Sequence, residues 1–269
     1  MKNKIIKIEN QIKNKIILIT GASGKLGSMM AYNLGILGAK LILIDNSIDN
    51  FKKLKKILIN KKKIKYKFYE CNLENQIERE NLINKIYKEF NYLNVLINNA
   101  AFVGESNLRG WNTKFPKQSL ETWRRAFEVN LTTPFHLIQS FENLLNKSNN
   151  ASIINISSIY GELGPKWDLY KGTKMGNPAA YSSSKGGLIQ LSRWLAVTLA
   201  PNIRVNSICL GGVHNKQNKL FKARYEKEVP LNRMATPKDL LGAIILLSSD
   251  MSKYITGQSV KVDGGWSAW

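Results

Sequence analysis

The chain is poor in the residue types that build metal centres and covalent cross-links. Its 269 residues include two cysteines and two histidines. Cys71 and Cys209 are far apart and form no C-x-x-C pair, and neither His136 nor His214 belongs to a cluster with metal-ligand spacing. We therefore expect no metal site and a packing role for both cysteines. So little cysteine also suits a reducing compartment, which favours a cytoplasmic protein.

Long apolar runs are missing as well. The longest apolar stretch, at residues 240–247, is far shorter than the roughly 20 residues that span a bilayer. Residues 1–14 interleave lysine with isoleucine and lack a small-residue cleavage site, so they do not resemble a signal peptide. No Pro/Gly-rich linker divides the remainder. We predict one domain over residues 1–269, with residues 1–14 as an amino-terminal extension, and no membrane partner.

Acidic residues are scarce relative to basic ones. The chain has 40 Lys and Arg against 19 Asp and Glu, which gives a formal net charge of +21. Such an excess invites a nucleic-acid or membrane-surface interpretation. The lysines are nevertheless spread along the chain, with one dense region at residues 52–67 where a surface helix is expected, so we predict a solvated basic surface and no nucleic-acid partner. The alternative is attraction of anionic ligands such as phosphorylated sugars, nucleotide sugars or acidic carrier proteins.

A glycine-rich turn indicates nucleotide binding. The apolar run KIILI leads into TGASGKLG at residues 20–27, and apolar residues then keep helical spacing. A strand, a glycine turn and a helix in this order let backbone N–H groups hold a pyrophosphate. A second apolar run ends at Asp45, where a carboxylate accepts hydrogen bonds from a ribose and repels a 2′-phosphate. This favours NAD(H) over NADP(H), although Lys25 argues weakly for a 2′-phosphate and Asp45 can also cap a turn.

A tyrosine and a lysine four residues apart suggest proton transfer. Tyr181 and Lys185 in AYSSSKGG share one face of a predicted helix, and Ser158 lies upstream in NISSIYG. A free phenol has a pKa of about 10, and a nearby cation lowers it toward the range in which a general acid or base works. An isolated Y-x-x-x-K match is weak, because a solvated tyrosine beside a surface lysine gives the same pattern.

These motifs together resemble the short-chain dehydrogenase/reductase family. TGASGKLG, NNAA at residues 98–101, VN at 129–130, the serine and tyrosine motifs and DGG at 263–265 follow the order of that family, and the resemblance covers residues 15–269. It implies an α/β fold, a single Rossmann-type doubly wound parallel sheet in a three-layer α/β/α arrangement. It also implies an NAD(P)-dependent oxidoreductase that acts on CH–OH groups.

The resemblance assigns catalytic roles to four residues. Ser158 would orient the reacting oxygen, Tyr181 would donate or remove a proton, and Lys185 would hold the nicotinamide ribose and lower the pKa of the phenol. Asn130 lies in a long predicted helix, four residues before Pro134, which lacks the N–H that normally bonds the Asn130 carbonyl. We hypothesise that this carbonyl holds a water in a proton relay to Lys185. A kink that only shapes packing is the alternative.

The resemblance also implies a set of cofactor contacts. These are Gly21, Ser23, Gly24, Lys25, Leu26, Gly27, Asp45, Asn72, Leu73, Asn99, Ala100, Ala101, Tyr181, Lys185, Gly211 and Val213. The chain departs from the family pattern at several of them. Lys25 stands where the family has a glycine, and Asn72 replaces an aspartate. Leu210 replaces a proline, and Asn215 lies near a threonine that holds the nicotinamide amide in relatives.

Two segments are candidates for substrate recognition. The approach from Ser158 to Tyr181 is longer than is usual in the family, and long loops beside catalytic sites are often functional. We predict substrate-side loops at residues 159–180 and 212–232. The candidate contacts are Trp167 and Tyr170 in the first loop and Arg109 and Trp111 after NNAA. Aromatic residues with nearby lysines suit an anionic sugar, whereas loops packed on each other or on a neighbouring subunit are the alternative.

The catalytic insert and the closing DGGWSAW segment resemble oxidoreductases of bacterial surface-sugar pathways, notably the flagellin-modification protein A type. We therefore predict NAD(H)-dependent interconversion of a secondary alcohol and a ketone on a sugar or nucleotide sugar. One alternative is a 3-oxoacyl-carrier-protein reductase. Another is a non-catalytic dinucleotide-sensing or nucleic-acid-binding protein on the same fold. The resemblance also implies a homotetramer or homodimer built through the two long helices and the carboxyl-terminal strand.

Overall fold

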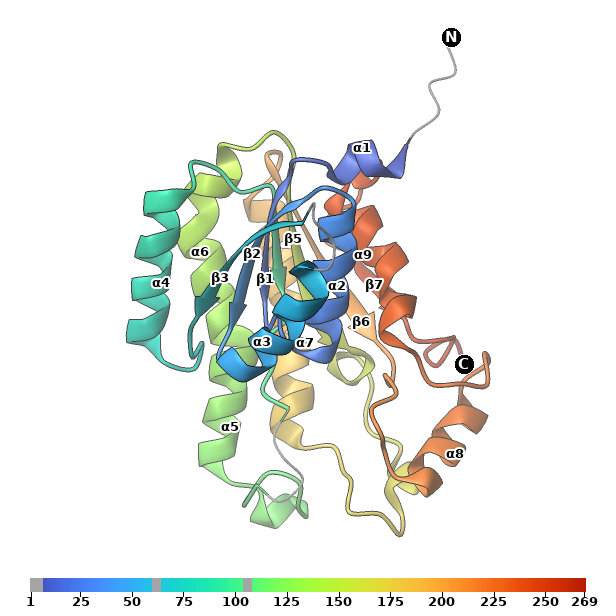
Figure 1. Cartoon of the computed structure of the whole chain (residues 1–269). Coiled ribbons are helices and arrows are strands. Elements are labelled where there is room, and N and C mark those ends of the chain that lie inside the picture. The colour runs from blue at the N-terminus through green and yellow to red at the C-terminus, as the bar shows by residue number, and fades with distance from the viewer. Residues whose placement is uncertain (1–6, 60–63, 104–107) are drawn as a thin grey trace.

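A parallel β-sheet forms the centre of the protein (Figure 1). The structure is a computed structural model that describes residues 7–59, 64–103 and 108–269. Residues 1–6 of the predicted extension and 60–63 of the lysine-dense region lie outside the described residues. The strands are β1 (Ile16–Thr20), β2 (Lys40–Asp45), β3 (Lys65–Glu70), β4 (Val95–Asn98), β5 (Ala151–Ser158), β6 (Ile203–Leu210) and β7 (Ser259–Val262). Their order is β3-β2-β1-β4-β5-β6-β7, and every pairing is parallel.

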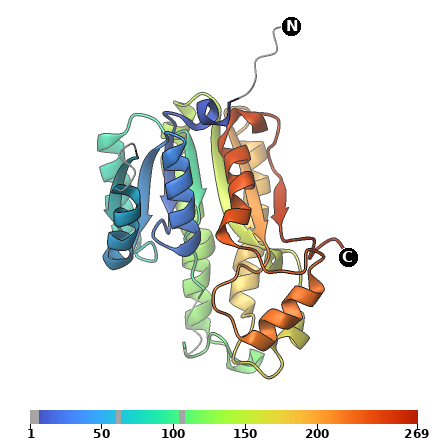
Figure 2. The ribbon, with the colours of Figure 1, turned by 45° about the vertical axis from the view of Figure 1, so that its right-hand side comes forward.

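Helices cover both faces of this sheet (Figures 1 and 2). They are α1 (Ile8–Ile12), α2 (Lys25–Ile36), α3 (Ile48–Ile59), α4 (Gln76–Glu89), α5 (Leu120–Phe127), α6 (Thr133–Asn146), α7 (Ala179–Thr198), α8 (Lys219–Glu228) and α9 (Leu241–Ser248). A π-helical segment, η2 (Glu128–Thr132), joins α5 to α6. The predicted Rossmann-type α/β/α fold is confirmed.

Alternate residues of the central strands enter two separate cores. Ile17 and Ile19 of β1 pack with residues of α2, α3 and α9, whereas Ile16 and Leu18 pack with residues of α4, α6 and α7. Successive side chains of a strand point to opposite faces, so a strand covered on both sides is apolar throughout. This explains why KIILI is continuously apolar rather than alternating.

The strand order places a crevice beside β1. The chain passes from β1 to β2 on one side, and β4 joins the opposite edge of β1. Connections that leave neighbouring parallel strands in opposite directions open a gap outside their carboxyl ends, where ligands bind in such sheets. The glycine turn follows β1 and NNAA ends β4, so both motifs lie at this gap.

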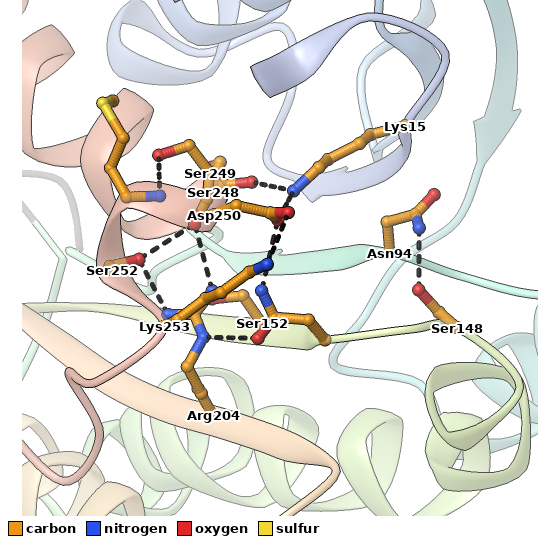
Figure 3. Close-up of polar contacts among 12 residues, drawn as sticks. Lys15, Asn94, Ser148, Ser152, Arg204, Ser248, Ser249, Asp250, Ser252 and Lys253 are labelled. Carbon is orange, nitrogen blue, oxygen red and sulfur yellow. Dashed lines mark hydrogen bonds and ion pairs between the residues drawn. The ribbon is translucent and has the colours of Figure 1, made fainter. Parts of the chain in front are cut away.

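A polar network joins the carboxyl-terminal part of the chain to the amino ends of the strands, opposite the crevice (Figure 3). The buried guanidinium of Arg204 donates to Asn150 Oδ1 at 3.1 Å and to Ser252 Oγ at 2.8 Å. Lys15 forms an ion pair with Asp250 at 3.0 Å. These contacts lie at the amino ends of β1, β5 and β6, far from the crevice, and we assign them to stability.

Candidate active site

A cleft of about 1230 Å³ opens at the carboxyl ends of the strands. Segments that follow β1, β2, β4, β5 and β6 all line it. The predicted cofactor residues that line the cleft are Gly21, Gly24, Lys25, Leu26, Asp45, Asn72, Leu73, Asn99, Ala100, Ala101, Tyr181, Lys185, Gly211 and Val213. Ser23 and Gly27 do not line it. The fold therefore gathers widely separated motifs around one cleft.

The glycine turn is packed too closely for larger side chains. A Cβ at Gly27 would lie 2.1 Å from the Gly21 carbonyl oxygen, and a Cβ at Gly21, whose φ is +62°, would lie 2.9 Å from the Ala100 Cα. The turn thus brings the start of α2 against the ends of β1 and β4. Helix α2 begins after Gly24 with no side-chain cap and no acidic residue in its first turn. Free N–H groups at such a helix start suit a phosphate group, so these residues fit a dinucleotide.

Asp45 has a structural role as well as a place in the cleft. Its carboxylate accepts from the Ser23 N–H at 2.8 Å and from the Ser47 N–H at 3.1 Å, and the residue is 8% exposed. Asp45 therefore caps the turn, as the alternative interpretation predicted, in addition to lining the cleft. Carboxylate oxygens have further lone pairs, so Asp45 can still accept from a ribose.

Lys25 links two walls of the cleft. Its ammonium donates to the backbone carbonyl of His214, in the segment after β6. Asn215 lines the cleft in the same segment, and its N–H donates to Gln217 Oε1 at 2.5 Å. The lysine that replaces the expected glycine thus holds the segment that follows β6.

Ser158 is the serine of NISS that faces the tyrosine. Its hydroxyl accepts from the Tyr160 N–H at 3.2 Å, and it lies close enough to the Tyr181 phenol to act on the pKa of that group. The neighbouring Ser157 hydroxyl donates instead to the Lys185 backbone carbonyl at 2.9 Å. The alternation of side chains along β5 explains this division.

Lys185 lies at the base of the cleft and is 2% exposed. Its ammonium donates to the Ile156 carbonyl at 2.7 Å, and burial lowers its pKa to about 8. Burial raises the pKa of Tyr181, and the nearby Ser158 hydroxyl opposes that rise only in part. The Lys185 ammonium is directed at the Ile156 carbonyl, and its predicted lowering of the pKa of the phenol stays a prediction.

Asn130 lies behind the cleft rather than on its wall. Its fully buried amide accepts from the Phe102 N–H at 2.7 Å and donates to the Ser184 hydroxyl at 3.0 Å. The predicted interruption of the long helix is the π-helical segment η2, in which the Thr133 N–H donates to the Glu128 carbonyl. Such segments occur frequently at functional sites. The proposed water on the Asn130 carbonyl stays a prediction.

Of the five predicted substrate residues, Ser158 and Arg109 line the cleft, whereas Trp111, Trp167 and Tyr170 do not. Trp111 is 3% exposed, donates its indole N–H to the Val103 carbonyl at 2.7 Å and packs edge-on against Phe102. Trp167 is 59% exposed, and Tyr170 is buried against Phe221. The alternative in which loops pack on each other therefore describes Trp111 and Tyr170 better, and Trp167 is largely exposed.

Two lysines of the insert have partners outside the cleft. Lys166 pairs with Glu228 of α8, and Lys171 pairs with Asp168 at 2.7 Å. The insert thus packs on α8, and neither lysine lines the cleft. Their pairing weakens the argument for an anionic group bound by this segment.

The substrate end of the cleft contains aromatic residues that the sequence did not single out. Tyr160, Phe221 and Tyr225 line it. Tyr225 stacks on Trp266 with ring centroids 4.6 Å apart and accepts from the Gly212 N–H through its hydroxyl. Arg125 also lines the cleft but makes two hydrogen bonds to Glu74. In the sequence, the position of Tyr160 directly after the strand that carries Ser158 indicated that Tyr160 could lie in the cleft.

The described ranges contain neither a cluster of metal ligands nor a helix that could span a membrane. Among residues 7–59, 64–103 and 108–269, no group of three or more His, Cys, Asp or Glu side chains is arranged to hold a metal ion. Within the same ranges, none of the helices has the length and apolar character needed to cross a membrane.

Known proteins resemble this chain over nearly its whole length. A family model described as "Enoyl-(Acyl carrier protein) reductase" matches residues 21–267. The 3-oxoacyl-[acyl-carrier-protein] reductase of Rickettsia typhi is 33% identical over 258 residues, which cover 93% of this chain and 96% of the relative. The post-translational flagellin modification protein A of Campylobacter coli is 29% identical over 257 residues, which cover 95% and 99%.

A solved structure shares the fold. The short-chain dehydrogenase of Leptospira borgpetersenii, crystallised with bound NAD⁺, superposes with a TM-score of 0.83 at 28% identity and covers 99% of this chain and 98% of its own. The matched family, the shared fold and the grouping of Ser158, Tyr181 and Lys185 lead to the same assignment. The chain belongs to the short-chain dehydrogenase/reductase family and is an NAD(P)-dependent oxidoreductase that acts on CH–OH groups.

Proposed function

We propose that this enzyme uses NAD(H) to interconvert a secondary alcohol and a ketone on a sugar or sugar derivative. The observation that carries the proposal is the substrate end of the cleft, where hydroxyl-bearing side chains converge. Ser158, Tyr160, Tyr181 and Tyr225 all line this region. Hydroxyl groups both donate and accept hydrogen bonds, so they match a ligand with several hydroxyls.

Different residues of the site would have different roles in the reaction. When bound, the dinucleotide supplies hydride to the ketone or accepts it from the alcohol. Ser158 and Tyr181, which both line the cleft, would hold the reacting oxygen. Tyr181 is protonated at neutral pH because burial raises its pKa, so it donates a proton to that oxygen during reduction. Lys185 and Asp45, on opposite parts of the cleft wall, would hold the two ribose groups of the cofactor.

Asp45 supports NAD(H) as the cofactor. Its carboxylate lines the cleft at the end of β2 and is anchored by two backbone N–H groups. An anchored negative charge at this position repels a 2′-phosphate. Lys25 is the cation that would offset it, but its ammonium is engaged by the His214 carbonyl.

A 3-oxoacyl-carrier-protein reductase is the second candidate. The 33% identity to the Rickettsia typhi enzyme favours it, and a net charge of +21 suits an acidic carrier protein. The hydroxyl-bearing side chains of the cleft count against it, because an acyl chain offers them no hydroxyl beyond the reacting oxygen. The 29% identity to the flagellin modification protein supports placing the sugar reaction in surface-glycan or flagellin-modification biosynthesis.

One assay separates the two candidates. The absorbance of reduced nicotinamide is followed with NAD(H) and NADP(H) across free sugars, sugar phosphates, nucleotide sugars and acyl thioesters. We expect turnover of a sugar with NAD(H), and turnover restricted to NADPH with acyl thioesters overturns the proposal. Tyr181→Phe should lose roughly 10²- to 10⁴-fold in turnover while it still binds cofactor. Tyr254→Phe, a change at a fully exposed tyrosine, serves as the matched control.

We also propose a homodimer or homotetramer built on the long helices. Phe135 of α6 and Trp194 and Val197 of α7 are 42%, 59% and 82% exposed. Apolar side chains exposed on neighbouring helices favour association. Light scattering tests the mass, and Trp194→Glu should lower it.

A further inference from the structure

Tyr160 is a second tyrosine in the cleft, and the proton-transfer step does not use it. It belongs to a short 3₁₀ turn, η3 (Ile159–Gly161), directly after Ser158. Its backbone N–H donates to the Ser158 hydroxyl at 3.2 Å, and its side chain lines the cleft. The position of Tyr160 is therefore tied to the group that orients the reacting oxygen.

The hydroxyl of Tyr160 is held from behind by Tyr170. The two phenol oxygens are 2.8 Å apart. Tyr170 belongs to η4 (Trp167–Tyr170) of the catalytic insert, is 8% exposed and does not line the cleft. Its ring packs on Phe221 of α8 with centroids 5.2 Å apart, and its carbonyl accepts from the Thr173 hydroxyl at 2.8 Å. Tyr170 is thus a fixed support, while Tyr160 faces the ligand space.

The number of hydroxyl protons indicates which tyrosine donates in the hydrogen bond between Tyr160 and Tyr170. Each phenol has one O–H, and only one of the two can occupy the hydrogen bond between them. The described part of the chain offers the Tyr170 hydroxyl no other acceptor, and leaving its proton unbonded in a buried position is unfavourable. Tyr170 therefore donates to Tyr160, which leaves the Tyr160 proton free to point into the cleft. Burial raises the pKa of both phenols, so both stay protonated at neutral pH.

We propose that Tyr160 donates a hydrogen bond to a second substrate oxygen, on the carbon next to the reacting one, and that Tyr170 is the positioning residue that orients it. The ligand class is then a vicinal diol or α-hydroxyketone, the arrangement repeated along a sugar. This inference rests on the proposed sugar function and sharpens it. It also gives the catalytic insert a role in specificity, although its own aromatic and lysine side chains do not line the cleft.

A matched pair of ketones tests the proposal. Acetoin carries a hydroxyl beside its carbonyl, and 2-butanone has the same carbon chain without it. We expect the wild-type enzyme with NADH to prefer acetoin by about tenfold or more in kcat/KM, because an unused buried donor disfavours the analogue that lacks its partner. Tyr160→Phe should reduce that preference to within about threefold. Tyr170→Phe should reduce it partly, and Tyr254→Phe should leave it unchanged.

The outcomes separate this proposal from the one on which it rests. A wild-type preference for acetoin that persists in Tyr160→Phe overturns the role of Tyr160 alone. An equal loss on both ketones in Tyr160→Phe assigns the residue to packing and also overturns it. Turnover of acetoacetyl coenzyme A with neither small ketone overturns the sugar function together with the inference. Binding of NADH, measured by its fluorescence, shows in each case that the variant is folded.

Discussion

Replacing Lys185 with methionine should stabilise the protein while it abolishes catalysis. Burial lowers the Lys185 pKa from 10.5 to about 8. At 1.36 kcal/mol for each pKa unit, keeping this ammonium charged in the fold costs roughly 3 kcal/mol. Methionine has a similar length and no charge, but it loses the hydrogen bond to the Ile156 carbonyl, a loss of about 1–2 kcal/mol. The net expectation at pH 7 is a stabilisation of roughly 1–2 kcal/mol.

The pH dependence of this difference is the sharper test. The folded pKa of Lys185 lies below its unfolded value, so the unfolded chain binds more protons between about pH 8 and pH 10.5. The destabilising contribution is complete below the folded pKa and disappears as the pH rises through this window. The stability advantage of Lys185→Met should therefore shrink by roughly 3 kcal/mol from pH 7.5 to 10.5 and change sign.

Urea unfolding without nucleotide measures the effect. Wild type, Lys185→Met and Lys55→Met, a control at an exposed lysine of α3, are compared at one protein concentration, because subunit association contributes to apparent stability. The control should track the wild type at every pH. A Lys185→Met variant that is less stable than the wild type at pH 7, with a difference that stays flat to pH 10.5, refutes the reasoning.

Three further changes test the framework around the site. Gly27→Ala should abolish nucleotide binding or folding, because its Cβ would lie 2.1 Å from a carbonyl oxygen of the turn, whereas Gly24→Ala, with a Cβ at 3.3 Å, should retain measurable NADH fluorescence. Arg204→Met should lower the urea-derived unfolding free energy by about 2–4 kcal/mol, because buried acceptors lose their donor. Burial raises the pKa of Asp250, but the hydrogen bonds and charges of Lys15 and Lys253 together outweigh burial and the net shift is downward. Its stabilising contribution should therefore be present above the unfolded pKa of 3.8 and be lost as the pH falls through the lower folded pKa, so Asp250→Asn should differ from the wild type at pH 6 and the difference should shrink below pH 3.8.

The sequence predicts those residues of the site that lie at or just after the carboxyl end of a strand. In a parallel sheet all carboxyl ends meet at one edge, so any motif placed just after a buried strand is also placed near the other motifs. Gly21, Asp45, Asn99 and Ser158 satisfy this condition, and all of them line the cleft. Their distance along the chain does not matter once the strands are recognised.

The direction of loop side chains does not follow from sequence in the same way. Tyr170 and Lys166 suggested ligand contacts by residue type, yet both meet partners on α8, more than fifty residues later in the chain. The composition of the insert shows what it can bind but not which surface it covers. The π-helical form of η2 was equally hidden, because Pro134 indicates a missing hydrogen bond without specifying the pattern that replaces it.

The insert acts on the cleft indirectly, and this affects how substrate specificity changes in such an enzyme. The insert packs against α8 through Tyr170 and Phe221, and it influences the cleft through the hydroxyl of Tyr160. A substitution in the insert thus acts on the substrate by moving or releasing a hydrogen-bond donor rather than by removing a contact. We expect turnover of simple ketones to depend on Tyr181 and Ser158 rather than on that hydroxyl. Selectivity among hydroxylated substrates should therefore vary with the insert while the proton-transfer chemistry remains the same.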